Sequence, residues 1–376
     1  MRKTVPLFGI YRERQMEDVV LDVLQSGQIA AGNYVNKFTE GFGKLTCQDH
    51  IVTVNDMSNA IQIALRLSDV QPGDEVLTTS FACMSTNAPI ASSGATPIWV
   101  DVNPATGQMD PDALVRSITS RSKAVIVYHL AGYPAEIEKI AKICSSHGLK
   151  LIEDCDNALL ASVGNQQVGC FGDFAIFSFY PNRQLNASEG GALSCRRRED
   201  AERAIRLRRY GIDLSQFRDQ QGEINPECDI PEIGWAATLN NMCSAMAYVQ
   251  LDGVAHRIQR AREYAGIYRE LLSQLSALDI VNPHETSVPS YWVFLVRVLN
   301  RDHILTTLKK AGIQASRLHY LNDRYSGFKT DRVTLPGTQD FFDHVLALPC
   351  GWWLTRQDVE SVCSVLSQAV AGQYDL

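Results

Sequence analysis

The sequence lacks any pair of cysteines at a metal-binding spacing, although it contains ten cysteines in 376 residues. The cysteines are scattered singly and no C-x-x-C pair occurs, so neither a zinc site nor a cysteine-ligated cluster is expected. Most of them stand among apolar residues, which is typical of inert core thiols. We therefore expect no metal in this protein.

An excess of positive charge and long apolar runs are also missing. The 35 basic and 42 acidic side chains give a net charge of −7, which offers no electrostatic attraction to nucleic acid or to an anionic membrane. No apolar run approaches the length of a membrane span, and the N-terminal stretch lacks the apolar core of a signal peptide. The sequence thus predicts a cytoplasmic protein without nucleic-acid or membrane partners.

Short apolar runs do alternate with helical patterns from about residue 51 onward. The runs are nearly continuous, as strands buried on both faces require, and the helical stretches between them predict right-handed crossovers. We therefore expect an α/β fold with a mostly parallel central sheet. FAIFSFY (174–180) and GALSC (191–195) are expected to form a hairpin-like pair. The other predicted strands are IVTVN, EVLTTS, TPIWVDV, KAVIVYHL and KLIEDCD.

The last third of the chain has a different pattern. A long helical stretch is expected from near Asn240, followed by shorter strands and helices that indicate a compact α+β unit. We expect a large domain over residues 1–245 and a smaller C-terminal domain over 246–376 that includes the long connecting helix.

Polar residues follow the predicted strands at the edge where ligands of a parallel sheet bind. Asp154 ends an apolar run; it is either a helix cap or solvated strand end, or a carboxylate that faces a cleft. Ser58 and Asn59 open a helix, either as an ordinary N-cap or as a seat for phosphate. His129 and Tyr133 flank another strand end, where packed or capping roles are expected.

The order and spacing of these motifs resemble the DegT/StrS family of sugar aminotransferases. The resemblance is carried by PGDEVLTTSF, GATPIWVDV, VIVYHLAGYPAEI, IEDCDNA, GDFAIFSFYPN and EGGALS, and continues through YWVFLVRV and KKAGIQASRLHY, so that it covers nearly the whole chain. It implies a fold-type-I pyridoxal-phosphate (PLP) scaffold with helices on both faces of the sheet. It also implies a homodimer with an active site shared between subunits, and a nucleotide-linked keto-sugar as the usual substrate.

The resemblance further implies roles for single residues. Asp154 would face the pyridine nitrogen of the cofactor and keep it protonated. Asn157 would lie near the ring, in place of the family's Gln or His. Ser178 and Ser58 would bind the phosphate, with Asn59 beside Ser58.

Other positions depart from the family's pattern or concern the sugar. Cys83 stands where an aromatic side chain usually stacks on the ring. Met57 replaces a small glycine, and Thr238 falls near an Asn or Arg that reaches the phosphate from the second subunit. His319 and Tyr320 occupy positions where the family approaches the sugar.

Arg183 falls at the position of the Schiff-base lysine, counted from Ser178 forward and from Gly191 back. Imine formation needs a deprotonated primary amine, whereas a guanidinium stays charged at any ordinary pH. Arg183 therefore cannot anchor the cofactor or serve as the base of transamination. It could instead clamp a phosphate or a carboxylate in bidentate fashion.

Three functions remain open at this point. The first is an enzyme or sugar-binding protein of polysaccharide or secondary-metabolite biosynthesis. It would act on a keto- or amino-sugar and hold PLP or pyridoxamine phosphate (PMP) non-covalently, or hold no cofactor. The second is a non-catalytic pseudoenzyme, such as the partner subunit of an active paralogue in a heterodimer. The third, ordinary PLP-dependent transamination, requires an amine that the loop does not offer.

Overall fold

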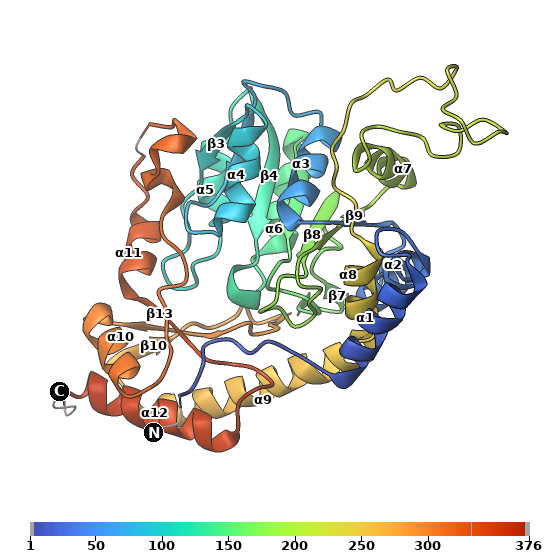
Figure 1. Ribbon diagram of the computed structural model, residues 1–376. Coiled ribbons are helices and arrows are strands. Elements are labelled where there is room, and N and C mark those ends of the chain that lie inside the picture. Colours follow the sequence, from blue (N-terminus) through green and yellow to red (C-terminus); the bar gives the residue numbers. More distant parts are fainter. Residues whose placement is uncertain (1–3, 332, 373–376) are drawn as a thin grey trace.

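The computed structural model of the chain describes residues 4–331 and 333–372, so the first three residues of the N-terminal stretch considered above lie outside it (Figure 1). No helix within these residues combines the length and the apolar composition needed to cross a bilayer. The α-helices are α1 (Arg14–Ser26), α2 (Asn33–Thr46), α3 (Met57–Leu67), α4 (Met84–Ser92), α5 (Pro111–Ser117), α6 (Ile137–His147), α7 (Arg198–Leu207), α8 (Asn241–Tyr248), α9 (Val254–Leu272), α10 (Arg301–Lys310), α11 (Pro336–His344) and α12 (Arg356–Val370).

A seven-stranded sheet forms the centre of the molecule, with the strand order β1-β9-β8-β5-β4-β2-β3. β9 pairs antiparallel with both of its neighbours, and the remaining pairs are parallel, so the predicted mostly parallel sheet is confirmed. The predicted hairpin-like pair is confirmed as well, since Ser178 lies opposite Gly191. The strands are β1 (Ile51–Val54), β2 (Glu75–Thr78), β3 (Thr96–Trp99), β4 (Ser122–Tyr128), β5 (Lys150–Asp154), β8 (Phe174–Ser178) and β9 (Gly191–Cys195).

Both faces of this sheet are buried, because successive residues of a strand point to opposite sides. In β4, Ala124 and Ile126 belong to the apolar cluster that includes α3 and α7. Val125 and Val127 belong to the cluster on the other face, which includes α2, α5 and α6. The continuous apolar runs seen in the sequence are therefore strands sandwiched between two layers of helices, as Figure 1 shows.

The C-terminal part contains an antiparallel sheet of three strands in the order β10-β12-β13. α9, α10 and α12 pack together beside it, and their apolar side chains form a single cluster with those of the sheet. The strands are β10 (Leu278–Ile280), β12 (Phe294–Val298) and β13 (Val345–Leu348); a further small sheet consists of β11 (Ser287–Val288), β6 (Ser162–Val163) and β7 (Gln166–Gln167).

The long helical stretch expected from near Asn240 is interrupted. Asn240 does cap a helix, since its side chain accepts a hydrogen bond from the Cys243 amide at 2.8 Å. However, α8 ends at Tyr248, and α9 begins only at Val254 after a 3₁₀ turn. Within the break, the Gln250 side chain donates to the Asn186 carbonyl at 2.6 Å, so the chain here is tied to the loop after β8. Apolar periodicity alone does not reveal such a tertiary tie.

Candidate functional site

The candidate site lies where the carboxyl ends of β4, β5 and β8 meet. Tyr128 at the end of β4 is in register with Asp154 at the end of β5. Ser178 closes β8, the next strand along the sheet. Residues that are far apart in the sequence therefore share one edge of the sheet, which is where ligands of parallel α/β folds bind.

Asp154 is completely buried, which excludes the alternative of a solvated strand end. One of its carboxylate oxygens accepts a hydrogen bond from the Thr86 hydroxyl at 2.7 Å, and the other accepts from the Asp156 amide at 3.0 Å. Burial, together with the nearby Asp156 carboxylate, raises the pKa of Asp154 to about 7. The structure thus holds an acid that a cationic ligand would stabilise as a carboxylate.

Arg183 forms a bidentate ion pair with Asp156, and both side chains are buried. Its Nη2 donates to Oδ2 of Asp156 at 2.6 Å, and its Nε donates to Oδ1. Burial alone would lower the pKa of Arg183, but the Asp156 carboxylate outweighs this and raises it above its ordinary value. The guanidinium is therefore engaged in bidentate fashion by a carboxylate of the chain itself.

Two further contacts fix the Arg183 guanidinium. Its central carbon lies 4.7 Å from the centroid of the Trp292 ring, within the range of a cation–π interaction. Nη1 donates to the side chain of Asn182, and the Trp292 indole donates to the Asn182 carbonyl at 3.0 Å. The loop after β8 is thereby tied both to the end of β5 and to the C-terminal part of the chain.

A chain of hydrogen bonds runs from Asn157 to His319. The Asn157 amide group donates to the Tyr128 hydroxyl, which lies 3.2 Å from Nε2 of His319. The hydroxyl hydrogen is therefore free to be donated to His319, whose other ring nitrogen then carries the proton. Burial lowers the pKa of His319 to about 4, so the imidazole is neutral at physiological pH. The Oδ1 atom of Asn157 is buried without a hydrogen-bond partner.

The remaining predicted residues around this edge lie closer to the surface or bond locally. Ser178 accepts from the Tyr180 amide at 3.3 Å. Cys83 precedes α4 as its N-cap, and its sulfur accepts from the Ser85 hydroxyl at 3.0 Å. Tyr320, which is 49% exposed, has its ring contacts with Tyr325 and Phe342 and not with the Asp154 group.

The N-terminus of α3 carries a carboxylate of its own. Asp56 is the N-cap, and its side chain accepts from the Ser58 amide at 2.7 Å. The Asn59 side chain donates to Asn55 at 2.7 Å. Ser58 and Asn59 therefore lie in the first turn of the helix, as expected, but the N-cap is Asp56. An incoming phosphate would share this helix end with an acidic side chain.

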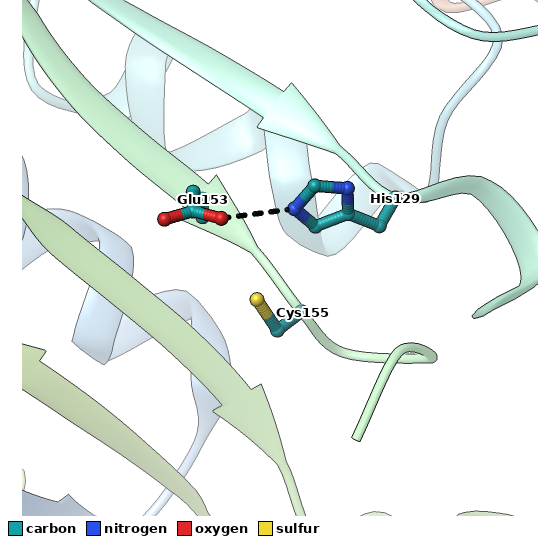
Figure 2. A group of neighbouring side chains, drawn as sticks. All are labelled: His129, Glu153 and Cys155. Atoms are coloured by element: carbon teal, nitrogen blue, oxygen red, sulfur yellow. Dashed lines mark hydrogen bonds and ion pairs between the residues drawn. The ribbon is translucent and has the colours of Figure 1, made fainter. Parts of the chain in front are cut away.

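A second buried group, His129, Glu153 and Cys155, has the residue types of a metal site, as Figure 2 shows. Glu153, however, accepts hydrogen bonds from three amides, those of Gly169, Phe171 and Gly172, at 2.6–2.7 Å. Nδ1 of His129 accepts from the Ala135 amide, so Nε2 carries the proton and donates to Glu153 at 3.2 Å.

Burial also raises the pKa of the Cys155 thiol well above its ordinary value, so the sulfur stays protonated. The Nδ1 lone pair of His129 is already occupied by the Ala135 amide. Glu153, supported by His129, therefore acts as a hydrogen-bonded clamp on residues 169–172. His129 thus has the packed role expected for it.

Several partners of the predicted residues were not predicted from the sequence. Asp156 stands two positions after Asp154 in IEDCDNA, and a second carboxylate so close to the candidate acid was a visible signal. Thr86, Tyr128 and Trp292 gave no local signal, because each becomes a neighbour only through the fold.

The side chains present fit part of a pyridoxal-type cofactor. Asp154 is a buried acid whose hydrogen-bond partners, Thr86 and an amide, leave it without a positive charge, and a protonated ring nitrogen would supply one. The unpartnered Oδ1 of Asn157 is a second polar atom of this edge. The amine needed for covalent attachment does not fit, because Arg183 offers a guanidinium engaged with Asp156.

Comparisons with known proteins agree with this fold. Residues 11–367 match the profile of the DegT/DnrJ/EryC1/StrS aminotransferase family. The chain is similar to AtS13 from Actinomadura melliaura (31% identity, TM-score 0.92, covering 97% of this chain and 98% of AtS13). It is also similar to the sugar aminotransferase CalS13 from Micromonospora echinospora (28% identity, TM-score 0.91, 97% and 99% covered). The aminotransferase TlmJ from Streptoalloteichus hindustanus has 26% identity and a TM-score of 0.91 (99% and 100% covered).

Proposed function

Because the chain belongs to the DegT/DnrJ/EryC1/StrS aminotransferase family, we propose that it acts on a nucleotide-linked keto- or amino-sugar and holds PLP or PMP without a covalent bond. The product would serve polysaccharide or secondary-metabolite biosynthesis. Support for the sugar comes from the family and from relatives such as the sugar aminotransferase CalS13.

The observation that carries the proposal is the difference between two buried carboxylates. Asp156 is neutralised by Arg183, whereas Asp154, two residues away, has no such partner and a pKa raised to about 7. A ligand with a protonated heterocyclic nitrogen would give Asp154 its counter-charge. An aldehyde or amine on the same ring would find no lysine in the loop after β8.

Each side chain of the site would then have a defined task. A bound pyridoxal-type cofactor supplies the electron sink that amino-group chemistry on a sugar needs. Asp154 would orient the ring and keep its nitrogen protonated, while Ser178 and Ser58 would bind the phosphate. The neutral imidazole of His319, held by Tyr128, would face the sugar as a hydrogen-bonding group.

Titration with PLP and with PMP, followed by absorbance and protein fluorescence, tests the proposal. We expect saturable binding that borohydride does not make covalent, and at least ~10-fold weaker binding by Asp154→Asn because the counter-charge is lost. Asp279→Asn, at a position that is 80% exposed, is the matched control and should bind like the wild type. A reducible adduct in the wild-type chain would contradict the proposal.

A non-catalytic partner subunit is the second candidate. The Arg183–Asp156 ion pair favours it, since a buried pair satisfied within the chain needs no ligand. This role predicts no binding of PLP or PMP, together with retained binding of a nucleotide sugar such as a uridine or thymidine diphosphate hexose, measured by calorimetry.

A further inference from the structure

Asp156 and Arg183 are more than a local ion pair. Both are buried and bound through two parallel hydrogen bonds. Asp156 follows β5 at the carboxyl edge of the sheet, while Arg183 belongs to the loop after β8. The pair therefore joins the segment that follows Asp154 to the loop after the neighbouring strand β8.

We infer that Asp156 is a positioning residue that, together with Arg183, keeps this site non-covalent, so that a lysine at position 183 would stay unreactive as long as Asp156 is present. The inference rests on the proposed function, in which Arg183 occupies the anchor position. It goes beyond that function because it assigns the lack of covalent attachment at position 183 to two residues, Arg183 and Asp156.

The physical reason is the counter-charge. A lysine ammonium at position 183 would lie beside the buried Asp156 carboxylate. An opposite charge at hydrogen-bond distance favours the protonated form of the lysine. Covalent attachment needs the neutral amine: Nζ adds to the aldehyde carbon, a carbon–nitrogen double bond forms, and the aldehyde oxygen leaves as water. Without the carboxylate, burial would favour the neutral amine instead.

The other members of the group do not remove this effect. Trp292 contributes the face of its ring, and Asn182 is a neutral amide. The remaining nearby acid, Asp154, has a pKa raised to about 7 and accepts from Thr86. Asp156 is thus the carboxylate that pairs directly with the side chain at position 183.

The experiment compares the wild type, Arg183→Lys, Asp156→Asn and the double variant Arg183→Lys/Asp156→Asn. Each protein is incubated with PLP at neutral pH and reduced with borohydride, and the adduct at residue 183 is measured by peptide mass spectrometry. We expect at least ~10-fold more adduct in the double variant than in Arg183→Lys, which corresponds to a difference of one unit or more in the lysine pKa. The wild type and Asp156→Asn should give none at this position.

A matched control uses an ion pair elsewhere. Arg203 also binds a carboxylate, Glu232, with two hydrogen bonds of 2.8 and 2.9 Å. Arg203→Lys/Glu232→Gln should give no more adduct at position 203 than surface lysines give. Asparagine keeps the volume of Asp156, and circular dichroism establishes that each variant is folded. If Asp156→Asn unfolds because Arg183 is left unpaired, the double variant still carries the test.

Three outcomes would overturn the inference. Equal adduct in Arg183→Lys and in the double variant would show that Asp156 has no influence. Reversible binding of PLP without adduct in either variant would show that position 183 is not the anchor, and the proposed function would survive. Absence of any PLP or PMP binding, in the wild type and in the variants, would remove both the inference and the proposed function.

Discussion

At the scale of single residues, the candidate site contains one buried ion pair and one buried carboxyl group that has no positively charged partner. Arg183 and Asp156 neutralise each other, while Asp154 is held as an acid with a raised pKa. Their positions in the sequence could single out Asp154 and Arg183 as candidate site residues. It could not show which carboxylate Arg183 binds, because that depends on how the loop after β8 folds back.

A pH dependence of stability follows from Asp154. Its pKa is about 7 in the folded chain and near 4 in an unfolded one, so the folded state binds the proton more tightly. Stability from this group is therefore fully present below pH 4 and is lost as the pH rises from about 4 to 7. We expect Asp154→Asn to lose less thermal stability than the wild type between pH 5 and pH 8, measured by calorimetry in the absence of cofactor. A larger loss in the variant would contradict the assignment.

The hydroxyl of Tyr128 gives a second prediction at this scale. Tyr128→Phe removes the group that links Asn157 to His319, and leaves buried polar atoms without partners. We expect the free energy of unfolding to fall by about 1–3 kcal/mol in urea titrations. Tyr325→Phe, at a position that is 43% exposed, serves as the comparison and should change it by less than ~0.5 kcal/mol.

At the scale of elements, the sheet could be predicted far better than the connections. Continuous apolar runs identified the strands and their burial, because period and length carry that information. The break between α8 and α9 could not be foreseen, since it depends on Gln250 bonding to a distant loop. The cap of α3 was likewise expected at Ser58 and Asn59, whereas the N-cap is Asp56, two residues before Ser58.

The clamp formed by Glu153 can be tested at this scale. Glu153→Gln replaces a carboxylate that accepts from three amides and from His129, so one oxygen becomes a donor facing other donors. We expect a loss of about 2–4 kcal/mol in the free energy of unfolding and faster hydrogen exchange at residues 169–172. Glu227→Gln, at an exposed position, should leave both unchanged. Unaltered exchange in the first variant would exclude the clamp.

The contact between β9 and α3 gives a further test. A Cβ atom at Gly191 would lie 2.9 Å from the Met57 backbone and 2.8 Å from the Phe177 carbonyl, and backbone atoms cannot give way as a side chain can. Gly191→Ala should therefore cost about 1–3 kcal/mol by overpacking, measured by denaturant unfolding. Gly266→Ala, at a helical glycine with open space around its Cβ, should not destabilise.

At the scale of the whole molecule, the fold class and the family were both predictable from the sequence and are confirmed. The fold class follows from the apolar runs and the helical stretches between them, because a doubly covered parallel sheet restricts how they can be arranged. The family followed from the resemblance of the motifs in their order and spacing. The assembly is a proposal of a different kind, since it concerns surfaces that the motifs do not describe.

We propose that the chain forms a homodimer. Residues 211–235 project from the body of the molecule as an extended segment beyond α7 (Figure 1). Leu214, Ile224 and Ile233 in this segment are 60–69% exposed, which is costly for large apolar side chains in water. Light scattering should give about twice the chain mass of 41.7 kDa. Ile224→Asp should shift the equilibrium towards the monomer, whereas Leu299→Asp, with a similar exposure of 70%, should not.

The two adjacent acids of β5 have a consequence for how this strand can vary. Glu153 accepts hydrogen bonds from the turn at residues 169–172, and Asp154 faces the ligand edge. The two side chains diverge because neighbouring residues of a strand point in opposite directions. A slip by a single residue could place Glu153 at the ligand edge and Ile152 opposite the turn, and the four donors that Glu153 now accepts from would lose their acceptor. The hydrogen bonds of Glu153 to the turn therefore fix the register of β5, and with it the position of Asp154 at the carboxyl end of the strand.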